Sequence, residues 1–282
     1  MKVGMRIPVI DDSDCDSRAI KEKLKQWRSF SQYTDVEALM CILKNRELKA
    51  NCLKNVDDLK EQTYLQPLID NDEALPYVSC FDHNKEENIP LWNMYSDDKY
   101  GVRIQFTIPQ STKDFHELLI DSKRFVKGCR SGADPINFRP KFATDFDMSY
   151  PYVWVHIATM PINYKNNLQI AAYQLPASNL INWKTLASVK SEDWKFQNEV
   201  RIVADFQNTG PEINDSDKIT EIPYFDYLLL PIRFSELEKI VITFSPWMQE
   251  QTKQMVSESI KQLNLDCECI VENSQLDKLI RR

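Results

Sequence analysis

"WKFQNEVRIV", residues 194–203, sets Gln197, Glu199 and Arg201 at two-residue steps behind a tryptophan. Successive side chains of a β-strand point to opposite faces, so a strand here would place these three polar side chains on one face. One interpretation is a solvated sheet face, on which a Glu199–Arg201 ion pair contributes at most about 1 kcal/mol. The other is a catalytic carboxylate, Glu199, flanked by the residues that orient it. The rest of the chain has to distinguish between the two.

The composition is that of a globular protein that is not specialised for binding polyanions. The chain has 282 residues, of which 43% are hydrophobic and 27% charged, and its formal net charge is -7. A chain of this length can bury a substantial core. It contains only 5 glycines, and neither of the common glycine-rich phosphate-binding motifs occurs. General binding to polyanions is therefore not expected.

The sequence predicts a cytoplasmic protein with no membrane segment and no metal. Its start has no apolar run of signal-peptide length, and no stretch approaches the roughly 18 apolar residues of a membrane span. The cysteines include no C-x-x-C pair, and the histidines have no ligand spacing. Reduced, packed thiols are therefore favoured over disulfides or a zinc site.

The apolar pattern predicts one domain preceded by a short extension. Residues 1–30 are highly charged, and Ile20, Leu24 and Trp27 have the spacing of an amphipathic helix. Residues 31–282 combine alternating strand patterns with helical ones, including a predicted helix over 177–190, without a regular β-α-β rhythm. We therefore expect an N-terminal helical extension and a single α+β domain. Its mixed or antiparallel sheet would be split around a cleft and flanked by helices.

The first half offers polar residues at a strand end. Thr34 and Glu37 form a capping-box pattern, which predicts a helix running to about Arg46. Gln32, Tyr33 and Thr34 would then lie where a strand meets a helix N-terminus, a place that binds anions and polar ligands readily.

An aromatic pair and a basic stretch are further candidates. Trp92 and Tyr95 lie three residues apart on a predicted short helix, where their rings could stack on a planar ligand or fill the core beneath the sheet. The basic stretch also contains phenylalanines, a combination that can bind single-stranded nucleic acid, although charge runs are more often solvated helix faces. Its basic residues are Lys123, Arg124, Lys127, Arg130, Arg139 and Lys141.

Five segments carry a family resemblance: "QYTDVEALMCILKNRELKANCLKNVDDLKE", "VSCF", "LWNMYSDDKYGVRIQF", "WKFQNEVRIV" and "LEKIVITFSPWM". In order and separation, over roughly residues 30–265, they resemble a bacterial family of unknown function. Its hallmarks are a Trp-x-x-Tyr turn before a glycine-containing strand and a tryptophan followed by Glu-x-Glu-x-Arg. That family is similar in motif order to the ADP-ribosyltransferase superfamily, which includes DNA-modifying bacterial toxins.

The resemblance implies an ADP-ribosyltransferase-like fold that uses NAD as co-substrate and needs no metal. Glu199 would stabilise the oxocarbenium-like transition state that forms as nicotinamide leaves the ribose. Gln197 would orient the acceptor, and Arg201 would fix Glu199 or contact phosphate. The residues that would contact NAD are Gln32, Tyr33, Thr34, Trp92 and Tyr95.

The sequence departs from the resemblance in two places. Gln32 and Tyr33 stand where the superfamily commonly has arginine or histidine, so a cation for the diphosphate of NAD is missing. Gln197 stands where the nearer family usually has glutamate, and a Gln-x-Glu pair is familiar in the superfamily.

The expected function is transfer of ADP-ribose from NAD to a macromolecule, either a protein or a nucleic acid, in a toxin or phage-conflict setting. Two alternatives stay open. The missing cation favours a catalytically inactive binding or sensor module of the same fold. The basic stretch favours a nucleic-acid-processing enzyme, for example one that carries out phosphate transfer on RNA.

Overall fold

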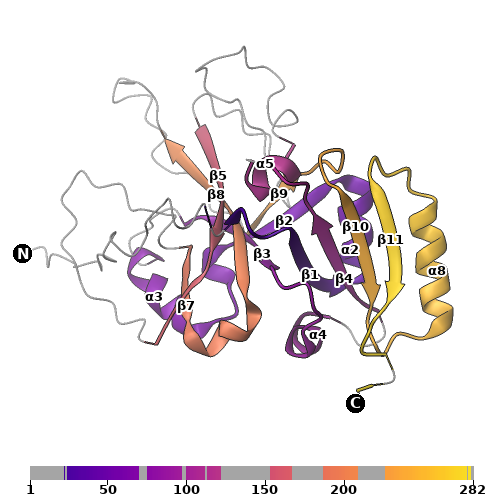
Figure 1. Ribbon diagram of the computed structural model, residues 1–282. Coiled ribbons are helices and arrows are strands. Elements are labelled where there is room, and N and C mark those ends of the chain that lie inside the picture. The colour runs from indigo at the N-terminus through magenta and orange to yellow at the C-terminus, as the bar shows by residue number, and fades with distance from the viewer. Residues whose placement is uncertain are drawn as a thin grey trace, which may run out of the picture.

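The computed structural model describes residues 22, 24–69, 75–96, 100–111, 113–121, 153–166, 187–208, 226–277 and 279–280. These residues form a mixed α+β fold, in which helices flank a mixed β-sheet (Figure 1). No helix in this part of the chain combines the length and the apolar character that crossing a membrane would require.

The elements are named by their order along the chain. The strands are β1 (Ser29–Asp35), β2 (Glu47–Cys52), β3 (Tyr77–Asp82), β4 (Gly101–Thr107), β5 (Val153–Pro161), β6 (Asn163–Lys165), β7 (Val189–Ser191), β8 (Glu199–Asn208), β9 (Tyr227–Pro231), β10 (Lys239–Phe244) and β11 (Glu268–Asn273). The helices are α2 (Val36–Asn45), α3 (Leu59–Ile69), α4 (Ile89–Tyr95), α5 (Phe115–Leu119) and α8 (Glu250–Lys261), with the 3₁₀ helices η2 (Leu53–Asn55) and η3 (Glu192–Gln197).

The main sheet forks at β3. Its strands follow the order β11-β10-β4-β1-β3-β2-β9, and β8 also pairs with β3 and carries β5 on its other side. Only one residue pair, Ser31 with Asp82, joins β1 to β3, whereas β3 pairs with β8 over its whole length. One half of the sheet is β11-β10-β4-β1, and the other is β3 with the strands attached to it, β8, β5, β2 and β9. Away from the Ser31–Asp82 pair the two halves separate. Among the described strands of this sheet, only β10 and β11 run parallel.

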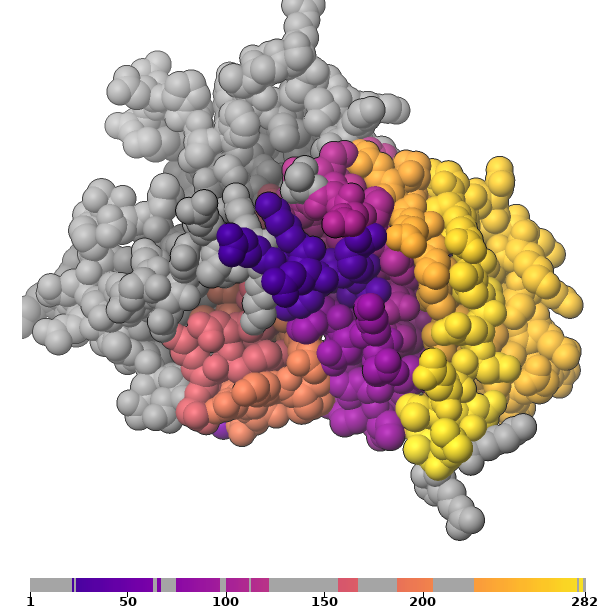
Figure 2. Space-filling view, in the orientation of Figure 1, coloured from indigo at the N-terminus to yellow at the C-terminus, as the bar shows by residue number. Residues whose placement is uncertain are grey.

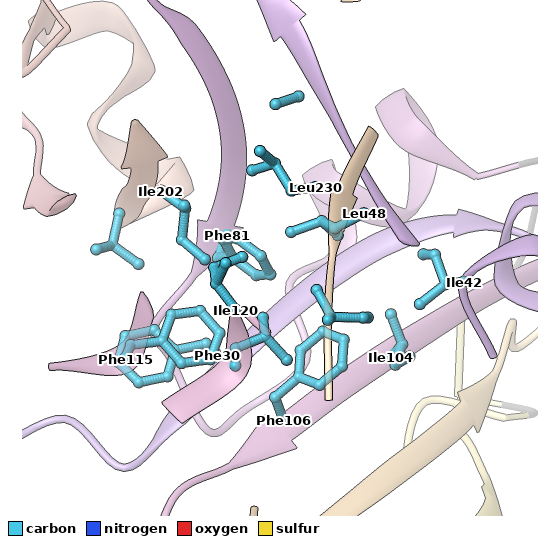
Figure 3. Close-up of a cluster of buried hydrophobic side chains, with 14 of the residues drawn as sticks. Phe30, Ile42, Leu48, Phe81, Ile104, Phe106, Phe115, Ile120, Ile202 and Leu230 are labelled. Carbon is cyan, nitrogen blue, oxygen red and sulfur yellow. The ribbon is translucent and has the colours of Figure 1, made fainter. Parts of the chain in front are cut away.

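The hydrophobic core holds the two halves together. Phe30 of β1 stacks on Phe115 of α5 with ring centroids 3.9 Å apart, and Phe81 of β3 meets the same ring edge-on at 5.0 Å. Figure 3 shows these rings together with Phe106 of β4 and the aliphatic side chains around them. In Figure 2 the N-terminal described residues, in indigo, accordingly lie beside the magenta residues of α5. These buried rings therefore hold β1 and β3 together through α5.

The helix predicted after Thr34 is present, but its cap was wrongly assigned. The N-cap of α2 is Asp35, whose Oδ1 accepts a hydrogen bond of 2.7 Å from the backbone N–H of Ala38. The helix ends at Asn45, because Arg46 adopts a left-handed conformation with φ 54°. Thr34 therefore belongs to the strand, and its side chain is not the cap.

Asp35→Ala is expected to lower the free energy of unfolding by about 1 kcal/mol, because the backbone N–H of Ala38 loses its acceptor. Urea denaturation followed by circular dichroism measures the change. Thr34→Ala is the matched control and should change the same quantity by less than about 0.5 kcal/mol. Equal effects of the two substitutions would contradict the assignment of the cap.

The stretch 194–203 is not one strand, contrary to the sequence-based expectation. Residues Glu192–Gln197 form η3, Asn198 has φ 43°, and β8 begins only at Glu199. Asparagine tolerates this left-handed conformation better than most residues. The predicted helix over 177–190 is also wrong at its end, since Val189 and Lys190 lie in β7. The other residues of that helix that precede 187 lie outside the described ranges.

Most of the predicted N-terminal extension also lies outside the described residues. Glu22 and Leu24 have helical geometry, and the Leu24 side chain is buried in the core. Trp27 stacks on His83 with ring centroids 3.8 Å apart, and β1 starts at Ser29. The end of the extension is thus packed against the domain.

A candidate ligand-binding cleft at the fork of the sheet

A cleft of about 670 Å³ lies at the fork, which is within the size range of cofactor pockets. Its walls come from β1, β2, β3, β9, one side of α2, the end of α4 and the segment from β7 to β8. Of the candidate site residues that lie in the described ranges, all except Trp92 line it. The lining residues that matter below are Ser31, Gln32, Tyr33, Thr34, Lys49, Cys80, Asp82, Tyr95, Lys190, Gln197, Glu199 and Arg201.

Arg201 anchors a buried charge network in one wall of the cleft. Its side chain is 1% exposed, and its Nε donates to Glu199 Oε1 at 2.5 Å. Its two terminal nitrogens donate to the carboxylate of Glu61 on α3, at 2.6 and 3.1 Å. The Glu199–Arg201 pair therefore exists, but it is buried, and the solvated face considered for it is ruled out. Arg201 positions Glu199.

Lys190 joins the two residues of the Gln-x-Glu pair. Its Nζ donates to Gln197 Oε1 at 2.7 Å and to Glu199 Oε2 at 2.8 Å, and lies 4.9 Å from the ring centre of Trp194. Gln197 and Glu199 thus meet in the cleft although only Glu199 is in the strand. Two formal positive charges, on Lys190 and Arg201, balance the two carboxylates of the network.

The electrostatic surroundings keep Glu199 ionised. Desolvation by burial raises the pKa of this carboxyl, but the charges of Arg201 and Lys190 outweigh it and lower the pKa to about 2. Because the pKa is depressed in the fold, the carboxylate stabilises the fold above its unfolded-state pKa. That contribution is lost as the pH falls through about 2. At neutral pH Glu199 is an anion that does not readily accept a proton.

Two tyrosines outside the charge network hydrogen-bond to Gln197 and Glu199. Gln197 Nε2 donates to the hydroxyl of Tyr95 at 2.8 Å, and the backbone N–H of Glu199 donates to the hydroxyl of Tyr164 at 2.8 Å. Desolvation raises the pKa of both phenols, which therefore stay neutral. Tyr95 is 36% exposed, so its ring is accessible from the cleft.

Cys80 lies next to Glu199 but is not an activated nucleophile. Its side chain is exposed, and its thiol hydrogen-bonds to the Glu199 carboxylate. Although the side chain reaches solvent, desolvation of the sulfur, and then the charge of Glu199, raise the pKa of the thiol. The thiol stays protonated at neutral pH.

Tyr33 and Trp92 form one aromatic unit. Their rings meet edge-to-face with centroids 4.9 Å apart, and the Tyr33 hydroxyl accepts a hydrogen bond from the backbone N–H of Asn88 at 2.8 Å. Trp92 is 0% exposed and donates its ring N–H to Glu87. Tyr33 therefore lines the cleft. Trp92, which belongs to α4, packs against the Tyr33 ring and does not line the cleft.

Gln32 and Thr34 also line the cleft. Gln32 Nε2 donates to Ser79 Oγ and to the backbone oxygen of Cys80, both at 2.9 Å, so its side chain bridges β1 and β3. The basic residues between Lys123 and Lys141 lie outside the described ranges, and the nucleic-acid interpretation stays a prediction.

The sequence interpretation missed Lys190, Glu61 and Tyr164. Lys190 fell inside the predicted helix, and Glu61 reads as one of several charges on α3. Tyr164 lies in β6, where it pairs with Lys190 of β7, and no sequence motif marks it. No local pattern marks these three as partners of Glu199.

Residues 91–202 match a family described as "Protein of unknown function (DUF2971)". The matched part runs from α4 into β8 and includes both Tyr95 and the Gln197–Glu199 pair. A domain of unknown function, which the sequence led us to expect, is therefore found in this part of the chain. The comparisons with curated proteins and with solved structures find no match.

Proposed function

We propose that the cleft binds NAD and that the protein transfers ADP-ribose from it to a macromolecule, as an ADP-ribosyltransferase-like enzyme. One observation carries the proposal. Gln197 at the end of η3 and Glu199 at the start of β8 share a cleft with Tyr33 and Tyr95 from the first half of the chain. The fork of the sheet beside them also supports the proposal, because the resemblance implies a sheet that is split around a cleft.

The charge on Glu199 suits the bond that would break. When the bond between nicotinamide and C1′ of the ribose lengthens, positive charge develops on the ribose, and a fixed carboxylate nearby stabilises it. Lys190 and Arg201 hold the Glu199 carboxylate in place, so no reorganisation is needed during the reaction. A carboxylate has about four lone-pair positions, which leaves room for a ribose hydroxyl.

Lys49 would supply the cation for the diphosphate of NAD that the resemblance places in the first motif and that this chain lacks there. It is exposed on β2, lines the cleft and lies 4.6 Å from the ring centre of Tyr227 on the neighbouring strand β9. Lys190 and Arg201 also line the cleft but are committed to carboxylates. Lys49 would hold the diphosphate of an NAD molecule where β2 and β9 line the cleft.

The proposal is tested by calorimetry with NAD and by measuring nicotinamide release. The wild-type protein should bind NAD and release nicotinamide. Glu199→Gln should retain NAD binding but lower the release rate at least about 100-fold, because the transition-state charge loses its partner. Lys49→Ala should weaken NAD binding about tenfold without removing the catalytic carboxylate.

Glu238→Gln is the matched control. Glu238 forms an ion pair with Arg28 at 3.3 Å at the surface, so this substitution should change neither NAD binding nor nicotinamide release. Thermal unfolding of each variant checks that it is folded. If the wild-type protein neither binds NAD nor releases nicotinamide, the proposal is wrong.

A catalytically inactive binding module is the second candidate, and one observation favours it. Both oxygens of Glu199 are already engaged by buried cations, at 2.5 and 2.8 Å, and the side chain is only 4% exposed. Such neutralisation reduces the charge that the carboxylate presents to a ribose. NAD binding without nicotinamide release by the wild-type protein would support this second function.

A further inference from the structure

Two buried oxygens at the fork of the sheet have no hydrogen-bond partner among the described residues: Asp82 Oδ2 and Ser31 Oγ. Both residues line the cleft, and Asp82 is 3% and Ser31 1% exposed. They face each other in the one pair that joins β1 to β3. Buried polar atoms are usually satisfied, so a pair of unsatisfied acceptors beside a cleft indicates a place for a hydrogen-bond donor of a ligand.

Glu199 lies next to this pair. Asp82 is opposite Glu199 in the pairing of β3 with β8, and opposite residues of neighbouring strands project from the same face. Ser31, Asp82 and Glu199 therefore occupy adjacent positions across three strands. A donor held between Ser31 and Asp82 would lie beside the carboxylate that faces the ribose.

Asp82 is held in a fixed orientation. Its Oδ1 accepts a hydrogen bond of 2.8 Å from the backbone N–H of Asn84, which leaves Oδ2 as the free oxygen. The charged and titratable groups on the elements packed around it are Arg103 on β4, Glu199 on β8 and Tyr33 on β1. Desolvation raises the pKa of Asp82 to about 7, against the opposing effects of the Asn84 N–H and of Arg103. A general base works best with a pKa near the working pH.

We propose that Ser31 and Asp82 form the subsite for the attacking nucleophile, a hydroxyl or amine of the acceptor, and that Asp82 takes its proton. This inference rests on the proposed function. The nucleophile forms a bond to C1′ of the ribose while the bond from C1′ to nicotinamide breaks. The electron pair of that bond stays on the nicotinamide nitrogen, and the proton of the nucleophile moves to Asp82 Oδ2. Glu199 stays ionised throughout and does not take the proton.

The test measures nicotinamide release from NAD, with water and with added hydroxylamine as nucleophile, across about pH 5 to 9. The wild-type kcat should rise with pH and level off above the pKa of Asp82, because the base acts only when deprotonated. Asp82→Asn should lower kcat about 100-fold, leave NAD binding nearly unchanged and abolish this pH dependence. Ser31→Ala should mainly raise the KM for hydroxylamine.

Asp58→Asn is the matched control. Asp58 is also 3% exposed, also accepts one backbone N–H, from Lys60 at 2.9 Å, and also has an Oδ2 without a partner among the described residues. It does not line the cleft, so its substitution should leave kcat and the pH profile unchanged. If Asp58→Asn lowered kcat as much as Asp82→Asn, the loss would come only from disturbing a buried carboxylate. That result would overturn the role of Asp82.

The outcomes separate the two proposals. If the wild-type protein releases nicotinamide and Asp82→Asn does so at the same rate with the same pH profile, the subsite is wrong and the proposed function stands. If the wild-type protein releases no nicotinamide with either nucleophile, both are wrong. A large fall in kcat with an unchanged NAD affinity and a flat pH profile supports the subsite.

Discussion

Arg201→Met should lower the free energy of unfolding by about 3–5 kcal/mol, which would be among the largest effects of a single substitution in this protein. The guanidinium makes three hydrogen bonds to the carboxylates of Glu61 and Glu199, and none of the three side chains is more than 5% exposed. Methionine fills a similar volume but leaves Glu61 buried without a cation. Urea denaturation at neutral pH measures the loss.

A double variant tests whether this loss of stability comes from the Glu61 carboxylate, which Arg201→Met leaves without a cation. The double variant Glu61→Leu, Arg201→Met removes one charge of each sign and keeps the Lys190–Glu199 pair. It should be more stable than Arg201→Met alone, because replacing a buried ion pair by apolar groups is often neutral. Lys113→Met, which removes an exposed ion pair with Glu236, should cost less than about 1 kcal/mol. An equally small cost for Arg201→Met would contradict the buried network.

The parts of the fold that the sequence predicts well are those with a regular pattern and a local boundary. β2 alternates Leu48, Ala50 and Cys52 into the core, as expected, because one of its faces is buried. The helix after β1 follows from its apolar stripe, although the cap is one residue later than expected. Capping patterns overlap when neighbouring residues can both accept a hydrogen bond, so the sequence alone did not distinguish Thr34 from Asp35.

The candidate site is harder to predict, because tertiary contacts create it. In an unbroken strand, Gln197 and Glu199 would share a face through alternation. In the structure a 3₁₀ helix and the left-handed Asn198 separate them, and Lys190 brings their side chains together. Lys190 lies in a three-residue strand, too short to show a period.

The partner of Arg201 is equally invisible in the sequence. Glu61 is 140 positions away along the chain, on a helix with other charged residues, and only the packing of α3 against the segment before β8 brings the two side chains together. The same holds for Asp82, which looks like an ordinary strand end. Its burial, its missing partner and its position opposite Glu199 all depend on the pairing of β3 with β8.

Asp82→Asn should stabilise the fold at high pH and have a much smaller effect at low pH. The pKa of Asp82 is about 7 in the fold, above the value near 4 of an unfolded aspartate. Between these two values the folded state binds one more proton than the unfolded state, so stability falls as the pH rises from about 4 to 7. Three pKa units correspond to about 4 kcal/mol at most, which is the upper limit of the gain above pH 7.

Chemical denaturation of both proteins at pH 5 and at pH 8 measures this gain. Glu199 does not interfere, because its pKa of about 2 keeps it ionised over the whole interval. A new hydrogen bond from the introduced amide to Ser31 Oγ would raise stability equally at both pH values, whereas the gain from removing the ionisable carboxyl is much larger at pH 8 than at pH 5. Asp82→Asn in a Ser31→Ala background cannot form this hydrogen bond, so the gain that remains there comes from removal of the carboxyl.

The two possible results have different meanings for the cleft. In the Ser31→Ala background, a gain that is equal at both pH values would mean that Asp82 is ionised in the folded protein already at pH 5, and it could then not serve as the proton acceptor near neutral pH. A gain that is much larger at pH 8 than at pH 5 would mean that the fold carries a destabilising carboxylate in its cleft, as expected for a group retained for binding or chemistry rather than for stability.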